Sequence, residues 1–234
     1  MLATAPATAS PPDYIVQAEY TQPTDRYDHG VLGDAVEWGA LVLTVDMCID
    51  CEGPARTFTV TFRLPENRVF EDIAPRIFTG EDGLPIVMVV ETDLTLGARL
   101  ALYDETGLIT ATPFIGRNYR WLAPIGAADL DGDGQIEIAY IDRPHLAKQL
   151  KVWRLSDGRL SQIATQDNLS NHQIGWDFIP GGLRDCGQGP EMVVASGDWS
   201  QVKLVRLDNG KLFTTTIGPY RTPSDLTAAL NCPN

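Results

Sequence analysis

The sequence has no long apolar run and few basic residues. No stretch approaches the roughly eighteen consecutive apolar residues that would predict a membrane-spanning helix. Lysine and arginine together number 18 against 31 aspartates and glutamates, so the net charge is −13. A surface of this sign repels nucleic acid and anionic lipid. We therefore expect no nucleic-acid partner and no membrane insertion, and we expect a cation, a sugar or a basic protein surface instead.

Cysteine is scarce but even in number. The chain has four cysteines, Cys48, Cys51, Cys186 and Cys232. An even number suits an oxidising compartment, and of the three connectivities that four thiols allow, we predict the local one, Cys48 with Cys51 and Cys186 with Cys232. The alternatives are a zinc site and a redox-active CxxC. Zinc needs four ligands, and the chain offers three histidines and no second CxxC.

The first twelve residues, MLATAPATASPP, have low complexity. Such a segment is typical of the lead that follows a signal-peptide cleavage site. We infer an export signal that has been removed and predict a periplasmic or secreted protein; a cytoplasmic origin stays open, since no signal is visible. Residues 13–234 are then expected to form one domain, because 44% hydrophobic residues suffice for a full core.

Internal repetition predicts the architecture of that domain. Residues 151–160, KVWRLSDGRL, recur 52 residues later as 203–212, KLVRLDNGKL, and each segment is typical of a strand, a tight turn and a second strand. Earlier hairpins are predicted with turns at 65–67 and 104–107. Successive turns are thus about 40 to 52 residues apart, which is the period of a β-propeller blade.

The apolar pattern supports an all-β fold with four blades of four antiparallel strands, and a five-bladed ring is the alternative. Continuous apolar strands, covered on both faces by neighbouring blades, are predicted at 40–45, 86–90, 138–141 and 192–195. The innermost strands are predicted at 27–32, 76–78, 125–129 and 178–183, and the blades at about 26–72, 73–121, 122–175 and 176–218. An extra strand at 14–20 is expected to join the last blade and protect its edge. A short C-terminal helix is predicted over 223–230.

The loop from Asp129 to Glu137, DLDGDGQIE, brings four carboxylates together. Calcium takes six to eight oxygen ligands, and the two glycines allow the tight turn that gathers them. We predict that Asp129, Asp131 and Asp133 bind one Ca²⁺ through their side chains, Gln135 through its backbone carbonyl and Glu137 through its carboxylate. An EF-hand is not expected, because strand-forming residues follow the loop. The alternative is an acidic turn that binds nothing.

The segment 124–142, PIGAADLDGDGQIEIAYID, resembles an FG-GAP or VCBS repeat, the calcium-loop blade of integrin α-like propellers and many exported bacterial proteins. The resemblance implies that the loop joins the first two strands of a blade. It also implies a protein-interaction or scaffold module, with another protein of the cell envelope or a glycan as partner. We therefore expect the chain not to be an enzyme. The other blades lack the acidic pattern, so one ion is predicted.

A group of polar and aromatic residues is predicted to converge on the opposite end of the propeller, where function often collects on loops. These ligand-binding candidates are Arg120, Trp121, Asp142, Arg143, His145, His172, Trp176 and Asp177. They could bind a sugar or a peptide by stacking and fixed polar contacts. An enzyme acting on a sugar or anionic substrate through the His145 loop is a further alternative. In the plainer interpretation, the two tryptophans belong to the core, Asp142 pairs with Arg143, and His145 lies on the surface.

Overall fold

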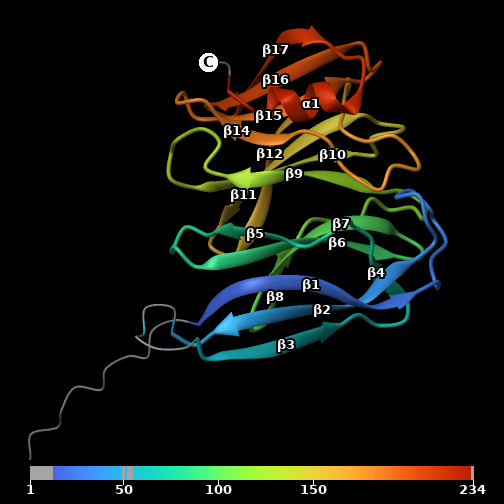
Figure 1. Ribbon diagram of the computed structural model, residues 1–234, viewed down its shortest axis with the longest axis vertical. Coiled ribbons are helices and arrows are strands. Elements are labelled where there is room, and N and C mark those ends of the chain that lie inside the picture. The colour runs from blue at the N-terminus through green and yellow to red at the C-terminus, as the bar shows by residue number, and fades with distance from the viewer. Residues whose placement is uncertain (1–12, 49–50, 52–54, 233–234) are drawn as a thin grey trace, which may run out of the picture.

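The computed structural model describes residues 13–48, 51 and 55–232, and the predicted N-terminal lead lies outside this range. The described chain is almost entirely β-structure and forms a small propeller of four blades, which confirms the predicted fold class (Figure 1). The strands are β1 (Tyr14–Thr24), β2 (Glu37–Asp46), β3 (Thr57–Arg63), β4 (Arg68–Phe70), β5 (Arg76–Thr79), β6 (Pro85–Asp93), β7 (Gly97–Asp104), β8 (Gly107–Ala111), β9 (Leu122–Ala128), β10 (Ile136–Asp142), β11 (Gln149–Ser156), β12 (Arg159–Asp167), β13 (Leu169–Ser170), β14 (Gly182–Asp185), β15 (Pro190–Ser196), β16 (Gln201–Asp208) and β17 (Lys211–Pro219).

The third blade has the predicted order. Strands β9, β10, β11 and β12 pair with one another in sequence, and all neighbours are antiparallel. The second strand, β10, is buried along nearly its whole length, as its continuous apolar sequence predicts. Strands β5 to β8 and β14 to β17 follow the same order. The two repeated segments lie in equivalent hairpins, β11–β12 and β16–β17.

The first blade differs from the prediction. Strand β1 pairs with β2, with Tyr20 opposite Leu41, so it forms the edge of the first blade and does not join the last one. Residues 27–32 form a loop, because β1 already occupies the edge position assigned to them. The turn at 65–67 does not close a hairpin either, since β4 pairs with β2 and β6 and thereby links the first two blades.

Apolar side chains fill the spaces between neighbouring blades. Leu41 and Leu43 meet Val87 and Val89 between the first and second blades, and similar clusters lie between the second and third and between the third and fourth. Each such fully buried side chain contributes about 1.5–3 kcal/mol to folding. Figure 1 shows the blades one above another in chain order, with β1–β3 at one end and β14–β17 at the other.

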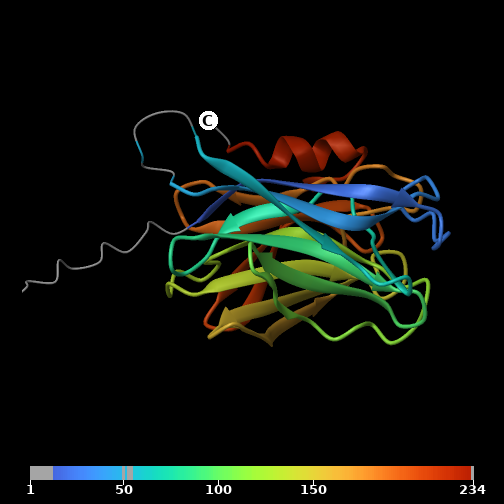
Figure 2. The same cartoon turned by 90° about the horizontal axis from the view of Figure 1, so that it is seen from below.

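The helix α1 (Pro223–Ala229) covers the outer face of the last blade, along one edge of the molecule in Figure 2. Its Leu226 is fully buried, and Asp225 closes a capping box with Thr222, which fixes the helix start. A disulfide from Cys186 to Cys232 holds the segment after the helix, and a second disulfide joins Cys48 to Cys51. Both predicted pairings are confirmed. No helix among the described residues is long and apolar enough to cross a membrane.

The long loop after β1 connects distant parts of the chain. Gly175, just before the last blade, donates its N–H to the carbonyl of Val31 at 3.1 Å. A glycine is required at position 33, because its φ is +95° and a Cβ there would lie 2.8 Å from the carbonyl oxygen of Gly175. This contact brings the 25–36 loop across the blade ends, and it carries His29 to the site described next.

Candidate functional site

All three histidines of the chain lie at one end of the blades. His145 Nε2 lies 3.0 Å from His172 Nδ1. His29 comes from the loop after β1 and is close enough for its charge to lower the pKa of His145. His29 and His145 also line a common cavity of about 30 Å³, which is room for a water molecule or a small substituent. We call these three residues the histidine site.

The contacts of His172 determine the hydrogen positions in this pair. Its Nε2 lies 3.0 Å from the carbonyl oxygen of Trp176 and must donate, because a carbonyl only accepts. In a neutral ring Nδ1 then accepts, so His145 donates from Nε2. The Nδ1 atom of His145 is left with its lone pair. Two successive hydrogen bonds, from His172 to the Trp176 carbonyl and from His145 to His172, therefore orient the basic Nδ1 atom of His145. The second residue of a catalytic dyad orients its partner in the same way.

Both rings are kept neutral. Burial, the adjacent His172 and the charge of His29 lower the pKa of His145 to about 4. Burial also lowers the pKa of His172, against the opposing hydrogen bond to Trp176. At neutral pH, His145 is consequently an unprotonated and well-oriented base.

His29 is held by a buried acid. Its Nδ1 lies 2.5 Å from Oε1 of Glu71, whose other oxygen accepts a hydrogen bond from Thr92. Glu71 has no exposed surface, and burial raises its pKa, while the contact with His29 opposes the rise. The contact engages Nδ1 of His29, so Nε2 is the ring nitrogen that remains for a substrate.

Trp121 belongs to the core beneath the histidines. It is 2% exposed, and its Nε1 donates to the backbone carbonyl of Glu71 at 2.7 Å. Its ring lies parallel to that of His145, with centroids 6.5 Å apart, and meets His172 edge-on at 4.9 Å. Of the two interpretations of this tryptophan, the core interpretation agrees with the structure, and the residue positions both histidines.

Two arginines lie at the rim of the histidine site. Arg120 and Arg143 line the same cavity, together with Tyr119. Arg143 forms two hydrogen bonds to the buried Asp142, at 2.9 and 3.0 Å, and Asp142 also pairs with Lys151 at 2.7 Å. Asp142 thus anchors positive charge instead of facing a ligand, while about a third of the Arg143 side chain remains exposed. The rim is suited to an anionic group.

Trp176 and Asp177 lie beside the histidine site. The Trp176 ring stacks on the ring of Phe178, with centroids 5.0 Å apart, and does not line the cavity. The backbone carbonyl of Trp176 accepts the hydrogen bond from His172. Asp177 is exposed and lies outside that lining as well. The site residue that the sequence interpretation did not select is His29, together with Glu71. His29 lies in the loop before β2 and Glu71 directly after β4, and no local sequence pattern distinguishes either residue.

The acidic loop lies at the opposite end of the third blade. Carboxylate oxygens of Asp129, Asp131 and Glu137 lie within 4.8 Å of one another, as a bound metal ion would require. The Asp131 side chain is 7% exposed, and its Oδ1 has no hydrogen-bond partner. A buried carboxylate oxygen without a partner is costly, and a cation would satisfy it. The residues present therefore fit a hard cation such as Ca²⁺.

Asp133 and Asp129 also make contacts within the loop. Asp133 pairs with Arg154 through Oδ2 at 2.9 Å and accepts the N–H of Gln135 through Oδ1. Asp129 accepts backbone N–H groups of residues 132, 133 and 134, so it organises the loop. Among the acidic side chains, the close group thus consists of Asp129, Asp131 and Glu137 and does not include Asp133, while the predicted role of the Gln135 backbone carbonyl stays a prediction.

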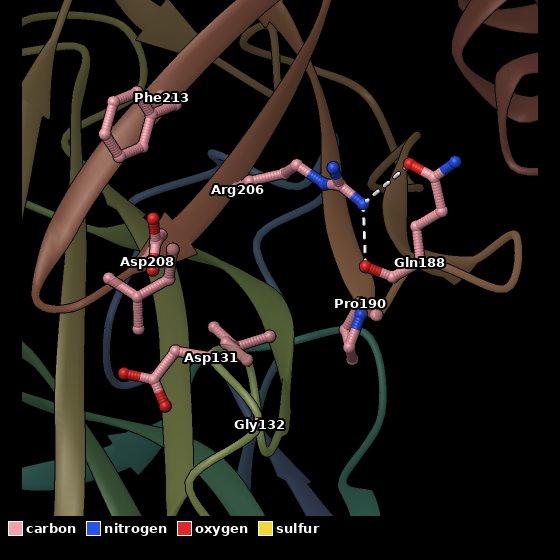
Figure 3. Close-up of a pocket in the computed structure, with 10 residues that line it drawn as sticks. Asp131, Gly132, Gln188, Pro190, Arg206, Asp208 and Phe213 are labelled. Carbon is pink, nitrogen blue, oxygen red and sulfur yellow. Dashed lines mark hydrogen bonds between the residues drawn. The ribbon is translucent and has the colours of Figure 1, made fainter.

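A groove runs from the acidic loop to the last blade. Its volume is about 500 Å³. Figure 3 shows Asp131 and Asp208 on one side of the groove and Arg206 and Gln188 on the opposite side, where Arg206 donates to the carbonyl of Gln188. Phe213, which is about half exposed, lies beyond Asp208. A smaller adjoining hollow of about 400 Å³ is lined by Arg154 and Asp208, among others.

Comparisons with known proteins give little to set beside this geometry. No family model and no curated protein matches the chain. Among the solved structures that match is the calcium-free form of CoXyl43, a GH43 β-xylosidase/α-arabinofuranosidase from a compost microbial metagenome, in complex with xylotriose. The TM-score is 0.37 and the identity 13%, over 87% of this chain and 82% of that chain. At this level the likeness concerns the fold alone.

The match nevertheless corrects one expectation. We predicted from the sequence that the chain is not an enzyme, and this prediction is contradicted by a structural neighbour that is named as a glycoside hydrolase. The prediction followed from the usual role of the resembled repeat, and a fold of this kind carries catalysts as well as scaffolds.

Proposed function

We propose that this protein is an enzyme that acts by acid–base catalysis on an anionic substrate, such as an acidic sugar, at the histidine site. The observation that carries the proposal is the convergence of all three histidines of the chain. Each faces a specific partner: His145 is oriented by His172, and His29 by Glu71. A histidine with a perturbed pKa beside a cavity is a functional-site candidate.

The two accessible histidines suit opposite roles. His145 presents the lone pair of Nδ1 and serves as the general base. His29, whose Nδ1 is held by Glu71, presents Nε2 and would serve as the general acid when the His29–Glu71 pair carries the proton to be donated. General acid–base groups of this kind typically contribute 10²- to 10⁴-fold to a rate. Arg120 and Arg143 at the rim would hold the negative charge of the substrate.

The test compares an acidic with a neutral substrate. Oligogalacturonates and neutral xylo-oligosaccharides of equal length are incubated with the protein, and products are followed by mass spectrometry. We expect turnover of the acidic series, reduced at least about a hundredfold in His145→Asn and in His29→Asn. Arg159→Gln, an exposed position at the far end of the third blade, serves as the unaffected control. An absence of turnover on both series, or full activity of His145→Asn, would contradict the proposal.

We also infer that the acidic loop binds calcium, one ion, as a structural cation. The close group of Asp129, Asp131 and Glu137 supports this assignment, as does the unpartnered oxygen of Asp131. When bound, the ion would neutralise carboxylates that otherwise repel one another. Isothermal titration with CaCl₂ and MgCl₂ tests the assignment. Binding of magnesium with equal or higher affinity would contradict it, since magnesium loses its water ligands reluctantly and is seldom held by protein ligands alone.

The resemblance to FG-GAP and VCBS repeats remains part of the proposal, because the acidic loop joins β9 to β10 as the resemblance implies. An exported, periplasmic or secreted location is proposed on the two disulfides, which persist in oxidising compartments. Comparing the free thiol content of the protein from periplasmic and cytosolic fractions tests the location. Free cysteines in the native protein would argue against export.

A second candidate function is carbohydrate binding without turnover. Trp176 and Phe178 form a stacked pair, and Phe178 is 41% exposed beside a groove that also contains Ile73 and Arg76. Exposed aromatic faces of this kind bind sugar rings or apolar protein surfaces, so a glycan or an envelope protein remains the proposed partner. Loss of glycan-array signal in Phe178→Ala, with His145→Asn unaffected, would favour this function over catalysis.

A further inference from the structure

The acidic loop already contains a positive charge of its own. Arg154 donates from Nε to Glu137 at 2.6 Å, and its two terminal nitrogens lie 2.9 Å from Asp131 and 2.9 Å from Asp133. One guanidinium thus contacts three of the four carboxylates of the loop. Two of the three belong to the group that could hold a metal ion.

The position of Arg154 is fixed by the sheet. It lies on β11 directly opposite Glu137 on β10, in a regular antiparallel register. Its side chain is 22% exposed, whereas that of Glu137 is fully buried. A cross-strand pair at fixed register keeps the backbone of Arg154 beside Glu137, so its guanidinium is always within reach of the loop. The contact is therefore a built-in feature of the blade and not a chance approach of a long surface side chain.

A metal ion and the guanidinium would share two carboxylates. Arg154 contacts Oδ2 of Asp131 and Oε1 of Glu137, while Oδ1 of Asp131 has no partner, so an ion held by Asp129, Asp131 and Glu137 would lie close to the guanidinium, and two cations at short range repel each other. We propose that Arg154 is an internal counter-ion that competes with the divalent cation, and that binding of the cation displaces it. This inference rests on the proposed calcium site and adds to it a residue that sets the affinity.

The structure provides a place for the displaced side chain. Arg154 lines the hollow of about 400 Å³ between the third and fourth blades, and Asp208 lines the same hollow. Asp208 also lines the larger groove, next to Asp131 (Figure 3). A guanidinium that leaves the loop can therefore turn toward the exposed carboxylate of Asp208, which lines the same hollow. Cation binding would then move one positive charge from the loop to the groove.

The test is calorimetric titration of CaCl₂ into the wild type, Arg154→Gln, Arg154→Lys and the control Arg159→Gln. Arg154→Gln removes the competitor, so we expect it to bind calcium at least about tenfold more tightly. Arg154→Lys keeps the charge but loses the planar fork, so an intermediate affinity is expected. Asp208→Asn should weaken calcium binding two- to threefold or more, because the displaced arginine loses its partner. Arg159→Gln should match the wild type.

The outcomes separate this inference from the calcium assignment. Equal or weaker calcium binding by Arg154→Gln, with a wild type that binds, overturns the competition and leaves the assignment intact. Binding by Arg154→Gln alone supports the competition in its strongest form. If neither protein binds calcium, both are overturned. Thermal unfolding in excess chelator is a second readout: loss of the counter-ion should lower the Tm of Arg154→Gln, and an unchanged Tm would contradict the proposed role.

Discussion

His145 Nε2 donates a hydrogen bond to His172 Nδ1 across 3.0 Å. A positive charge on either imidazole would be unfavourable, because each ring is partly buried beside the other. Protonating His145 at Nδ1 would place a positive charge in a half-buried position close to His29 and Lys148. The pair thus combines a functional property, a neutral base at physiological pH, with a thermodynamic one, a stability that depends on pH.

The first prediction concerns acid stability. The pKa of His145 is lowered from its usual value to about 4 by burial and by His172, so the unfolded chain binds a proton that the folded protein does not. Stability therefore rises with pH between about 4 and 6.5 and is lost as the pH falls through this window. His145→Gln should reduce the loss between pH 7 and 4.5 by roughly 1–3 kcal/mol, measured by urea unfolding. An unchanged pH dependence would contradict the assignment.

The buried carboxyl group of Glu37 leads us to predict the opposite dependence of folding stability on pH. This carboxyl is 3% exposed, and burial together with Glu71, Asp34 and Asp72 raises its pKa to about 9. The folded protein then binds a proton that the unfolded chain has lost, so stability falls as the pH rises from about 4.5 to 9. Glu37→Gln should be more stable than the wild type at pH 8, by up to a few kcal/mol, and nearly equal at pH 4.5. Glu19→Gln, on the neighbouring strand and exposed, is the control.

Trp121 provides a test of positioning. Trp121→Phe keeps the buried ring but removes the N–H that donates to Glu71, and a buried carbonyl left without its donor costs about 1–3 kcal/mol. We expect this loss of stability in urea unfolding. We also expect a lower kcat with little change in KM on any substrate that the protein turns over, because the histidines lose their support. A rise in KM alone would indicate instead that the tryptophan contacts substrate.

The sequence predicted most of the repeating strands and the C-terminal helix α1, and it missed the arrangement of the first blade. The β11–β12 and β16–β17 hairpins follow from their matching segments, and β10 follows from its apolar run. The prediction for the first blade was wrong, because the pairing of β1 with β2 depends on contacts that no local sequence pattern encodes. A strand of alternating residues can serve as the edge of several sheets with similar local propensity.

The site was predicted only in its parts. Asp129, Asp131 and Glu137 are neighbours in sequence, so their convergence could be read from spacing. His29 and His145 are far apart in the chain, and long-range contacts such as those of Val31 with Gly175 and of His29 with Glu71 bring His29 to the blade ends. Arg154 was missed for a similar reason, since its place in the acidic loop depends on the β10–β11 register.

If the acidic loop binds calcium, a substitution in it should change the melting temperature in a calcium buffer more than in a buffer with excess chelator. Asp131→Asn should lower the Tm in millimolar calcium, because the variant loses a ligand to the ion. In excess chelator we expect a change below about 1 kcal/mol, since the lost contact to Arg154 is offset by weaker repulsion among the remaining carboxylates. Differential scanning fluorimetry in both buffers is the measurement. Equal melting temperatures of variant and wild type in calcium would count against the ion.

The two disulfides predict unequal effects on stability. The bond from Cys186 to Cys232 spans 46 residues, whereas the bond from Cys48 to Cys51 spans 3. If a disulfide acts mainly by restricting the unfolded chain, the long loop contributes about 4 kcal/mol and the short one about 1–2 kcal/mol. The long bond also holds the segment after α1, whose Leu226 covers the last blade, so its removal exposes that apolar face.

Pairwise replacement by serine tests this difference. We expect Cys186→Ser with Cys232→Ser to lower the urea midpoint at least twice as much as Cys48→Ser with Cys51→Ser, and to loosen α1 first in hydrogen exchange. The short-loop variant is the matched control, because it removes the same atoms from a loop whose closure constrains little chain. Equal losses in the two variants would show that strain or local packing, and not chain entropy, determines the contribution of these bonds.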